Sequence, residues 1–134
     1  MSMLDLADLN LGSAIEPKAV EGGKEHQLRI VAINVAQDKN GMTYWQPRVE
    51  VVNDPNSKDF THFLHVPDRD KMDDKKLNQS KWNMKLFMES LGVDLARSIE
   101  PNDLIGETFW AILGKKTDEM YGDQNFISQF VRPK

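Results

Sequence analysis

Hydrophobic and polar residues alternate along much of the chain, which is the pattern of β-strands with one buried face. Strands are expected at residues 24–37, 42–52, 59–66, 106–116 and 124–131. Short turns separate the first three strands, because "DKNG" at 38–41 and "NDPNS" at 53–57 are rich in turn-forming residues. These three strands are therefore predicted to form an antiparallel meander.

The alternation assigns the two faces of the second and third strands. In the second strand, Trp45, Val49 and Val51 are expected to face the core, and Tyr44 and Arg48 to face outward. The third strand alternates in the same way, with an inner set of Phe60, His62, Leu64 and Val66 and an outer set of Thr61, Phe63 and His65.

Pro47 and the first strand complicate this assignment. Pro47 has no N–H for a sheet hydrogen bond, so the second strand is expected at a sheet edge or with a bulge there. A bulge would shift the strand by one residue and exchange its inner and outer faces. The first strand is apolar on both faces, which fits either full burial or a long strand bent across two halves of a small barrel.

Residues 81–92, "KWNMKLFMESLG", have the periodicity of a helix instead. The apolar residues fall at i, i+3, i+4 and i+7, and Trp82 and Leu86 widen the stripe that is formed by Met84, Phe87, Met88 and Leu91. Ser80 is the expected N-cap residue, and Gly92 is the expected residue just beyond the C-terminal end.

Three strands, one helix and two further strands are the element order of the five-stranded Greek-key barrel known as the oligonucleotide/oligosaccharide-binding (OB) fold. The predicted fold class is therefore all-β with one helix, and the helix is expected to close the open end of the barrel with its apolar stripe. In this fold the face of strands 2 and 3 and the 1–2 and 4–5 loops bind the ligand. The remaining large aromatic residues are expected in the core: Trp45, Trp82, Phe109 or Trp110, Phe126 and Phe130.

Residues 1–23 differ from the rest and are predicted to be a flexible acidic N-terminal arm, followed by one OB-like domain at 24–134. The arm alternates leucines with Asp and Asn and then reaches Pro17 and the Gly22–Gly23 pair. Its leucines, Leu4, Leu6, Leu9 and Leu11, are available to dock on the domain or on a partner, including a second copy.

Composition and charge narrow the function. The chain has 134 residues and a net charge of −4. Residues 1–23 hold four acids and one base, whereas residues 24–134 hold 17 acids and 16 bases, so the domain is nearly neutral. A local basic patch is still able to bind phosphates, because salt screens charges beyond roughly 8 Å. The chain has no cysteine, no secretory signal pattern and no apolar run near the roughly 20 residues of a membrane span, so a cytoplasmic location is expected.

Proteins that bind single-stranded nucleic acids combine cations for the phosphates with aromatic rings for the bases. Both kinds of residue fall on the predicted outer face and in the two loops. The predicted nucleic-acid-binding residues are Lys39, Tyr44, Arg48, Phe63, His65, Lys115, Lys116 and Tyr121. In the alternative interpretation, Tyr44 and Phe63 pack under the arm or a dimer partner, and the two adjacent lysines form a solvated turn.

Other chemistry has little support. His62 and His65 are three apart on a strand and so point to opposite faces, which is poor for joint metal binding. The acids of "DRDKMDD" at 68–74 lack the Gly and the final Glu of a calcium-binding EF-hand loop. No phosphate-binding glycine loop, GxSxG or HExxH motif occurs. The chain is therefore not expected to be an enzyme or to need a cofactor or a metal.

Three segments also resemble a group of small phage-encoded proteins from replication and recombination gene clusters, known as a domain of unknown function. The segments are "GMTYWQPRVEVV", "KWNMKLFMESLGVD" and "DLIGETFWAILGKKTDEMYGDQNFISQF", and the likeness covers about residues 24–132. The resemblance implies an OB-like single-stranded-DNA-binding protein that acts in the host cytoplasm beside a recombinase, nuclease or helicase. Many such proteins end in an acidic tail, whereas this chain ends in the basic "QFVRPK".

The sequence thus predicts a non-enzymatic, sequence-tolerant single-stranded-DNA-binding protein of a phage replication or recombination system. Its expected partners are single-stranded DNA, replication or recombination proteins and a second copy bound through the arm, with no membrane. The alternative is a protein-interaction module or oligomeric scaffold that uses the same barrel face.

Overall fold

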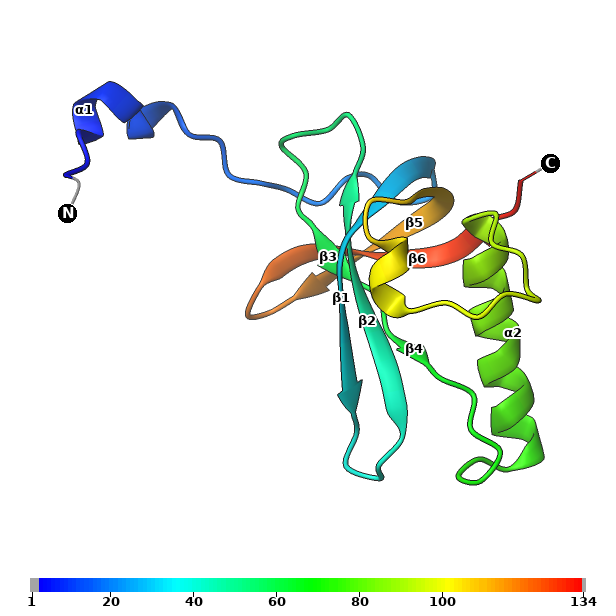
Figure 1. The fold of residues 1–134 in the computed structure, drawn as a ribbon. Helices are drawn as coiled ribbons and strands as arrows, with labels where there is room; N and C mark the ends of the chain where they lie inside the picture. Colours follow the sequence, from blue (N-terminus) through cyan, green and yellow to red (C-terminus); the bar gives the residue numbers. More distant parts are fainter. Residues whose placement is uncertain (1–2, 134) are drawn as a thin grey trace.

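The computed structural model describes residues 3–133, which form an antiparallel sheet, one long helix and an extended N-terminal arm (Figure 1). The strands are β1 (Glu25–Gln37), β2 (Thr43–Val51), β3 (Phe60–Thr61), β4 (Leu64–His65), β5 (Thr108–Asp118) and β6 (Gly122–Val131). The helices are α1 (Leu6–Leu9) and α2 (Asp74–Ser90), with 3₁₀ turns η1 (Leu11–Ser13) and η2 (Pro101–Leu104). The strand order is β3-β2-β1-β5-β6, and β4 also pairs with β2. The expected β-rich fold is confirmed, as an open sheet with β3 and β6 at its two ends.

The predicted third strand is divided into β3 and β4, and Pro47 is the reason. Both short strands keep one register against β2, since Arg48 pairs with Thr61 and Tyr44 with His65. Between them the N–H of His62 donates to the Pro47 carbonyl over 2.9 Å, but Pro47 has no N–H to donate in return. The expectation that β2 lies at a sheet edge is wrong, because β2 lies between β1 and these two strands.

The bulge lies in β1, opposite β2, and not in β2 itself. The register shifts between Ile30 and Ala32, so one extra residue enters β1 and its inward-facing positions change parity. Before the shift Leu28 and Ile30 are fully buried, and after it Ile33 packs against the core. β1 pairs with β5 through its first residues and with β2 along the rest. A long strand that bends between two parts of the sheet thus explains why both parities are apolar.

Helix α2 starts earlier than predicted. Its N-cap is Asp73, whose carboxylate accepts a hydrogen bond of 2.8 Å from the N–H of Lys76. Ser80 is therefore not the cap: it lies within the helix, and its hydroxyl donates to the His65 carbonyl over 2.9 Å. The first two turns are mostly polar, so they carry no apolar stripe from which the start could have been inferred.

The C-terminal end of α2 matches the prediction. Gly92 adopts φ +73°, the left-handed conformation that favours glycine after a helix. The N–H of Gly92 donates to the Glu89 carbonyl and the N–H of Val93 to the Met88 carbonyl, each over 3.0 Å. This pair of hydrogen bonds is the Schellman motif, which satisfies two carbonyls at the helix end.

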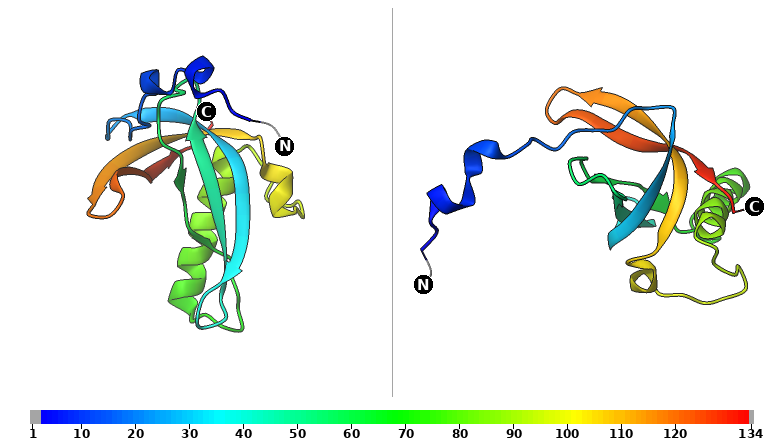
Figure 2. Two further views of the ribbon diagram at one scale, coloured as in Figure 1. Left: turned by 90° about the vertical axis from the view of Figure 1, so that its left-hand side faces the viewer. Right: turned by 90° about the horizontal axis from the view of Figure 1, so that it is seen from above.

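The core lies between the sheet and α2, which covers β4, β5 and β6 (Figure 2). The fully buried ring of Phe87 stands 5.8 Å from that of Phe109 and 5.9 Å from that of Phe130. Met88 is also buried, whereas Met84 and Leu91 are only partly buried at the edge of the core.

Two aromatic residues that were expected in the core are exposed instead. Trp82 and Phe126 keep 48% and 40% of their surface accessible. Trp82 lies on the outer side of α2, where Lys85 and Arg132 approach its ring. Of the neighbouring pair on β5, Phe109 is the residue in the core.

The arm lies away from the sheet up to about residue 14, Ile15 and Glu16 line a hollow beside His26 of β1, and residues 18–20 are held on the domain. Residues 3–18 are exposed, and they include the single-turn helix α1 (Figure 1). Lys18 exchanges backbone hydrogen bonds of 2.9 Å with Asn56 and Lys58 in the β2–β3 connection. The backbone of Val20 bonds the side-chain amide of Asn125 through both its N–H and its carbonyl. Contacts between the arm and the domain are thus already present at residues 18–20, a few residues before the Gly22–Gly23 pair.

Candidate functional site

Three rings gather on the outer surface of β2 and β4, and we refer to Tyr44, Phe63 and His65 as the ring cluster. Tyr44 and His65 are direct cross-strand partners. The centroid of the Tyr44 ring lies 6.3 Å from that of Phe63 and 5.9 Å from that of His65. Phe63 is 61% exposed, a large fraction for a phenylalanine on a sheet. The predicted outer faces of both strands are confirmed, because the parity did not slip at Pro47.

A groove lies between the two ends of the sheet, and we refer to it as the β3–β6 groove. Its volume is about 490 Å³, and it is lined by Lys58, Asp59, Phe60, Thr61, His62, Phe63, Lys116, Gln124, Asn125, Phe126 and Ile127. Two of these residues form a second aromatic position, since the Lys116 ammonium lies 5.9 Å from the centroid of the Phe126 ring. The groove therefore combines an exposed phenylalanine from each side with cations and amide groups.

A second groove, which we refer to as the turn groove, lies between the β1–β2 turn and the start of α2. Its volume is about 300 Å³, and its lining includes Asp38, Asn40, Met42, Phe63, His65, Lys76, Gln79 and Asn83. Phe63 lines both grooves. The ring cluster thus stands between two hollows, each of which contains at least one lysine.

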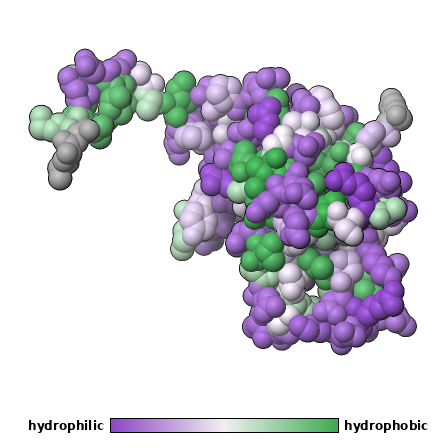
Figure 3. All heavy atoms as spheres, viewed as in Figure 1, coloured by the Kyte–Doolittle hydropathy of each residue, from purple (hydrophilic) through white to green (hydrophobic). Residues whose placement is uncertain are grey.

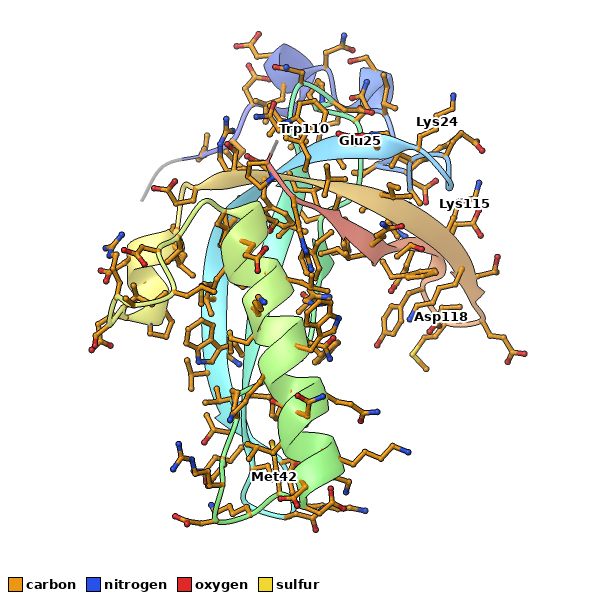
Figure 4. All side chains as sticks on the ribbon, turned by 90° about the vertical axis from the view of Figure 1, so that its right-hand side faces the viewer. Lys24, Glu25, Met42, Trp110, Lys115 and Asp118 are labelled. Carbon is orange, nitrogen blue, oxygen red and sulfur yellow. The ribbon has the colours of Figure 1, made fainter. Side chains whose placement is uncertain are left out.

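The two adjacent lysines of β5 lie on opposite faces of the strand. Both stand at the end of the strand predicted at 106–116 and were counted with the 4–5 loop, but β5 runs on to Asp118, and successive side chains of a strand point to opposite faces. Lys116 lines the β3–β6 groove. The Lys115 ammonium instead lies 3.7 Å from the Glu21 carboxylate, and Figure 4 shows Lys115 beside Lys24, away from Asp118 at the end of β5. Lys115 is therefore not part of the candidate site.

Tyr121 lies in the tight turn between β5 and β6 and is 64% exposed. Its backbone carbonyl and that of Asp123 each accept a hydrogen bond of 2.9 Å from the Lys58 ammonium. Lys58 therefore connects the segment before β3 to the β5–β6 hairpin at one end of the β3–β6 groove. The Tyr121 ring lies beyond the residues that line this groove.

Two of the predicted site residues on β2 and β4 lie close to carboxylates. Arg48 lies 3.1 Å from Asp59, and Nε2 of His65 lies 3.9 Å from Asp38. The backbone N–H groups of Met42 and Asn40 donate to Asp38, and these hydrogen bonds hold the pKa of its carboxyl below the usual value. Within residues 3–133, no carboxylate lies within ion-pair distance of four lysines at the site: Lys39, Lys58, Lys76 and Lys116.

His62 lies at the inner side of the β3–β6 groove, as its strand position predicts. Its ring meets that of Phe130 edge-on at 5.4 Å. Burial lowers the pKa of His62 to about 4, because a charged imidazole would lose its hydration there. At neutral pH this side chain is therefore a neutral imidazole, and it adds no positive charge to the groove.

Sequence reasoning missed Phe126, Lys58 and Lys76. Phe126 is opposite Gly114 on β5, and its ring covers the glycine so closely that a Cβ there would overlap it. The glycine within the predicted strand was a usable signal, because glycine in a strand often marks a close approach. The sequence does not state which residue approaches, since that depends on the β5–β6 register.

Comparisons with known proteins do not identify a family for this chain. No family model matches this sequence, and no curated protein matches it significantly. The resemblance to the phage proteins therefore stays a prediction. Within residues 3–133, no three metal-binding side chains lie close enough together to hold an ion. The helices in that same range are too short or too polar to cross a membrane.

Proposed function

We propose that this protein binds single-stranded DNA without strong sequence preference and catalyses no reaction. The observation on which the proposal rests is the exposed ring cluster, with Phe63 shared by two lysine-containing grooves. An exposed phenylalanine beside further rings is unfavourable in water and is typical of an interaction site. Rings flanked by lysines fit single-stranded nucleic acid, because the bases stack and the phosphates need cations.

The strand order supports an OB-like barrel as the setting of this site. Strands β1, β2 and β3 follow one another, and β5 and β6 continue the sheet from the other edge of β1. The OB-fold is a partly open barrel in which strands 2 and 3, with the flanking loops, form the ligand-binding face. The ring cluster occupies β2 and the β3–β4 segment, which is the corresponding position.

The binding path follows from the positions of the side chains. Bases stack on Tyr44, Phe63 and Phe126, each at about 1–3 kcal/mol. The phosphates follow the lysines that have no carboxylate partner within residues 3–133, from Lys39 in the β1–β2 turn and Lys76 at the turn groove to Lys58 and Lys116 at the β3–β6 groove. Arg48 contributes less, because a phosphate has to compete with Asp59 for it.

Titration of a labelled oligo(dT) strand at several salt concentrations tests the proposal. Contacts from four lysines predict that the logarithm of the binding constant falls with the logarithm of salt at a slope of about −3. Fluorescence anisotropy gives the constants, and a double-stranded oligonucleotide of the same length is the control. No binding at low salt with saturating oligonucleotide would contradict the proposal, and so would equal affinity for the duplex.

The resemblance to phage proteins supports a role in replication or recombination. Such a protein would cover single strands beside a recombinase, nuclease or helicase. Because stacking on rings is tolerant of base identity, the site suits strands of any sequence.

A further inference from the structure

The N-terminal arm presents a row of apolar side chains that contact nothing in this chain's own core. Between 54% and 95% of the surface is accessible for Met3, Leu4, Leu6, Leu9, Leu11 and Ile15. In Figure 3 the part of the chain that projects from the domain shows hydrophobic residues among hydrophilic ones. Exposed apolar residues at this density, with polar residues among them, are typical of a contact surface.

The arm also has a local shape. Asp5 caps α1 by accepting hydrogen bonds from the backbone N–H groups of Ala7 and Asp8 at 3.1 and 3.3 Å. Leu6 and Leu9 are three residues apart and therefore lie on one side of α1. Asp5 and Asp8 have the same spacing and lie together on another side. The arm is therefore a short amphipathic element with an acidic edge.

A groove of matching character lies between α2 and the segment 93–99 that follows it, and we refer to it as the helix groove. Its volume is about 290 Å³, and it is lined by Pro67, Lys81, Met84, Lys85, Met88, Val93, Asp94, Leu95, Arg97 and Ile99. The floor is formed by methionine and aliphatic side chains, and Leu95 is 55% exposed. Methionines suit a surface that has to accept an apolar ligand, because their side chains adapt in shape.

The arm and the helix groove are opposite in charge, and both are apolar. Residues 3–16 of the arm contain three acids, Asp5, Asp8 and Glu16, and no base. The helix groove has three bases and one acid among its lining residues. We infer that the arm of one molecule docks in the helix groove of a second copy, with leucines on the apolar floor and acids against Lys81 and Arg97.

The way in which the arm is anchored favours docking in the helix groove of a second copy over docking in the helix groove of the same molecule. Lys18 and Val20 fasten the arm to the β2–β3 connection and to β6. From there the arm runs outward, and Figures 1 and 2 show it and α2 on opposite sides of the sheet. Two molecules that exchange arms form a closed two-fold dimer, whereas arms that are passed on from one molecule to the next join head to tail into chains or rings.

This inference is independent of DNA binding, since the helix groove shares no lining residue with the turn groove or the β3–β6 groove. A molecule with an occupied helix groove keeps its ring cluster accessible. If the protein also binds single strands, adjacent molecules on one strand would be linked through their arms.

Sedimentation equilibrium of the full-length protein without nucleic acid tests self-association. The wild-type protein should show an average mass that rises with concentration above the monomer mass of 15.4 kDa. The double variant Leu6→Ser/Leu9→Ser should associate at least tenfold more weakly and melt at the wild-type temperature, because both leucines are exposed in the monomer. A wild-type protein that stays monomeric up to millimolar concentration would overturn the inference, and so would a double variant that associates normally.

A charge exchange tests which surfaces meet. An arm variant, Asp8→Lys/Glu16→Lys, and a groove variant, Lys81→Glu/Arg97→Glu, should each lose self-association, because like charges then face one another. A mixture of the two variants should regain it, since each arm is again opposite in charge to the other variant's groove. Lys75→Glu, on the same helix but outside the groove, should behave as wild type. A mixture that stays monomeric, or a Lys75→Glu protein as weak as the groove variant, would refute the assignment.

Discussion

Two groups of rings sit on opposite sides of the same strand segment, and they differ in what surrounds them. Phe87, Phe109 and Phe130 pack beneath α2, with His62 against Phe130. The ring cluster of Tyr44, Phe63 and His65 lies on the outer surface. His62 and Phe63 are neighbours in the chain, yet one belongs to the buried group and the other to the exposed cluster.

The comparison shows that the presence of an aromatic ring does not by itself decide whether a residue stabilises the fold or is accessible to a ligand. The buried group removes apolar surface from water and so stabilises the fold, at about 25 cal/mol per Å² buried. The exposed cluster leaves most of the Phe63 surface in water and contributes little to folding. Variants in the two groups should therefore separate stability from binding.

The largest expected effect is on stability, in the buried group. Phe87→Ala should reduce the free energy of unfolding by about 3–5 kcal/mol, because it leaves a cavity among three packed rings. Urea denaturation followed by circular dichroism measures the loss. Phe63→Ala is the matched control and should change stability by no more than about 0.5 kcal/mol. Equal losses in both variants would show that the two groups do not differ as described.

The next effect depends on pH and comes from His62. The pKa of His62 is lowered to about 4 in the folded protein, whereas an unfolded histidine titrates near 6.5. As the pH falls from 6.5 to 4, the unfolded chain takes up a proton that the folded protein does not. The free energy of unfolding should therefore fall by up to about 3 kcal/mol over this range, and above pH 6.5 His62 contributes no pH dependence.

His62→Phe should remove this part of the pH dependence while keeping a ring against Phe130. The comparison requires urea denaturation of both proteins at a series of pH values between 4 and 7. Because the carboxylates titrate in both proteins, the difference between the two curves isolates His62. Parallel curves would mean that His62 is not buried as the structure indicates.

Binding effects should come from the exposed cluster. Phe63→Ala and Phe126→Ala should each weaken binding of oligo(dT) by about 1–3 kcal/mol, the value of one stacked base. Trp110→Ala is the control, because Trp110 is exposed to a similar extent but lines neither groove. Anisotropy titrations at fixed salt compare the variants. A loss that is as large for Trp110→Ala would indicate non-specific contacts.

The smallest effect distinguishes two adjacent lysines. Lys116→Gln should make the salt dependence of binding shallower by about 0.7 in slope, the contribution of one phosphate contact to a single strand. Lys115→Gln should leave the slope unchanged, because Lys115 points to the other face and pairs with Glu21. Titrations of both variants at four or more salt concentrations provide the slopes. Equal changes would place both lysines on the DNA path.

Features of this protein that depend on neighbouring residues were predictable. The inner and outer faces of β2 and of the β3–β4 segment follow from alternation, so Phe63 was correctly placed outside and His62 inside. Gly92 marked the end of α2, because a helix that stops there needs a residue with positive φ. Pro47 was correctly seen as a missing hydrogen-bond donor, although the strand it interrupts is its neighbour.

Features that depend on distant pairing were not predictable from the chain. The burial of Phe109 rather than Trp110 and the exposure of Trp82 depend on which side α2 and β6 cover. The cover of Gly114 by Phe126 depends on the β5–β6 register, and the position of Lys58 depends on its contact with a hairpin far away in sequence. Alternation in the strand predicted at 106–116 already separates Lys115 from Lys116, but only the structure shows that Lys116 is the one that lines the groove.

The sequence by itself determined the strand faces, the helix end and the acidic, leucine-rich character of the arm, because these arise from residues a few positions apart. The tertiary structure alone determined the grooves, the lysines without carboxylate partners among residues 3–133 and the helix groove that complements the arm. Grooves form where segments far apart in the chain approach each other, and such distances are set by the packing of the whole domain.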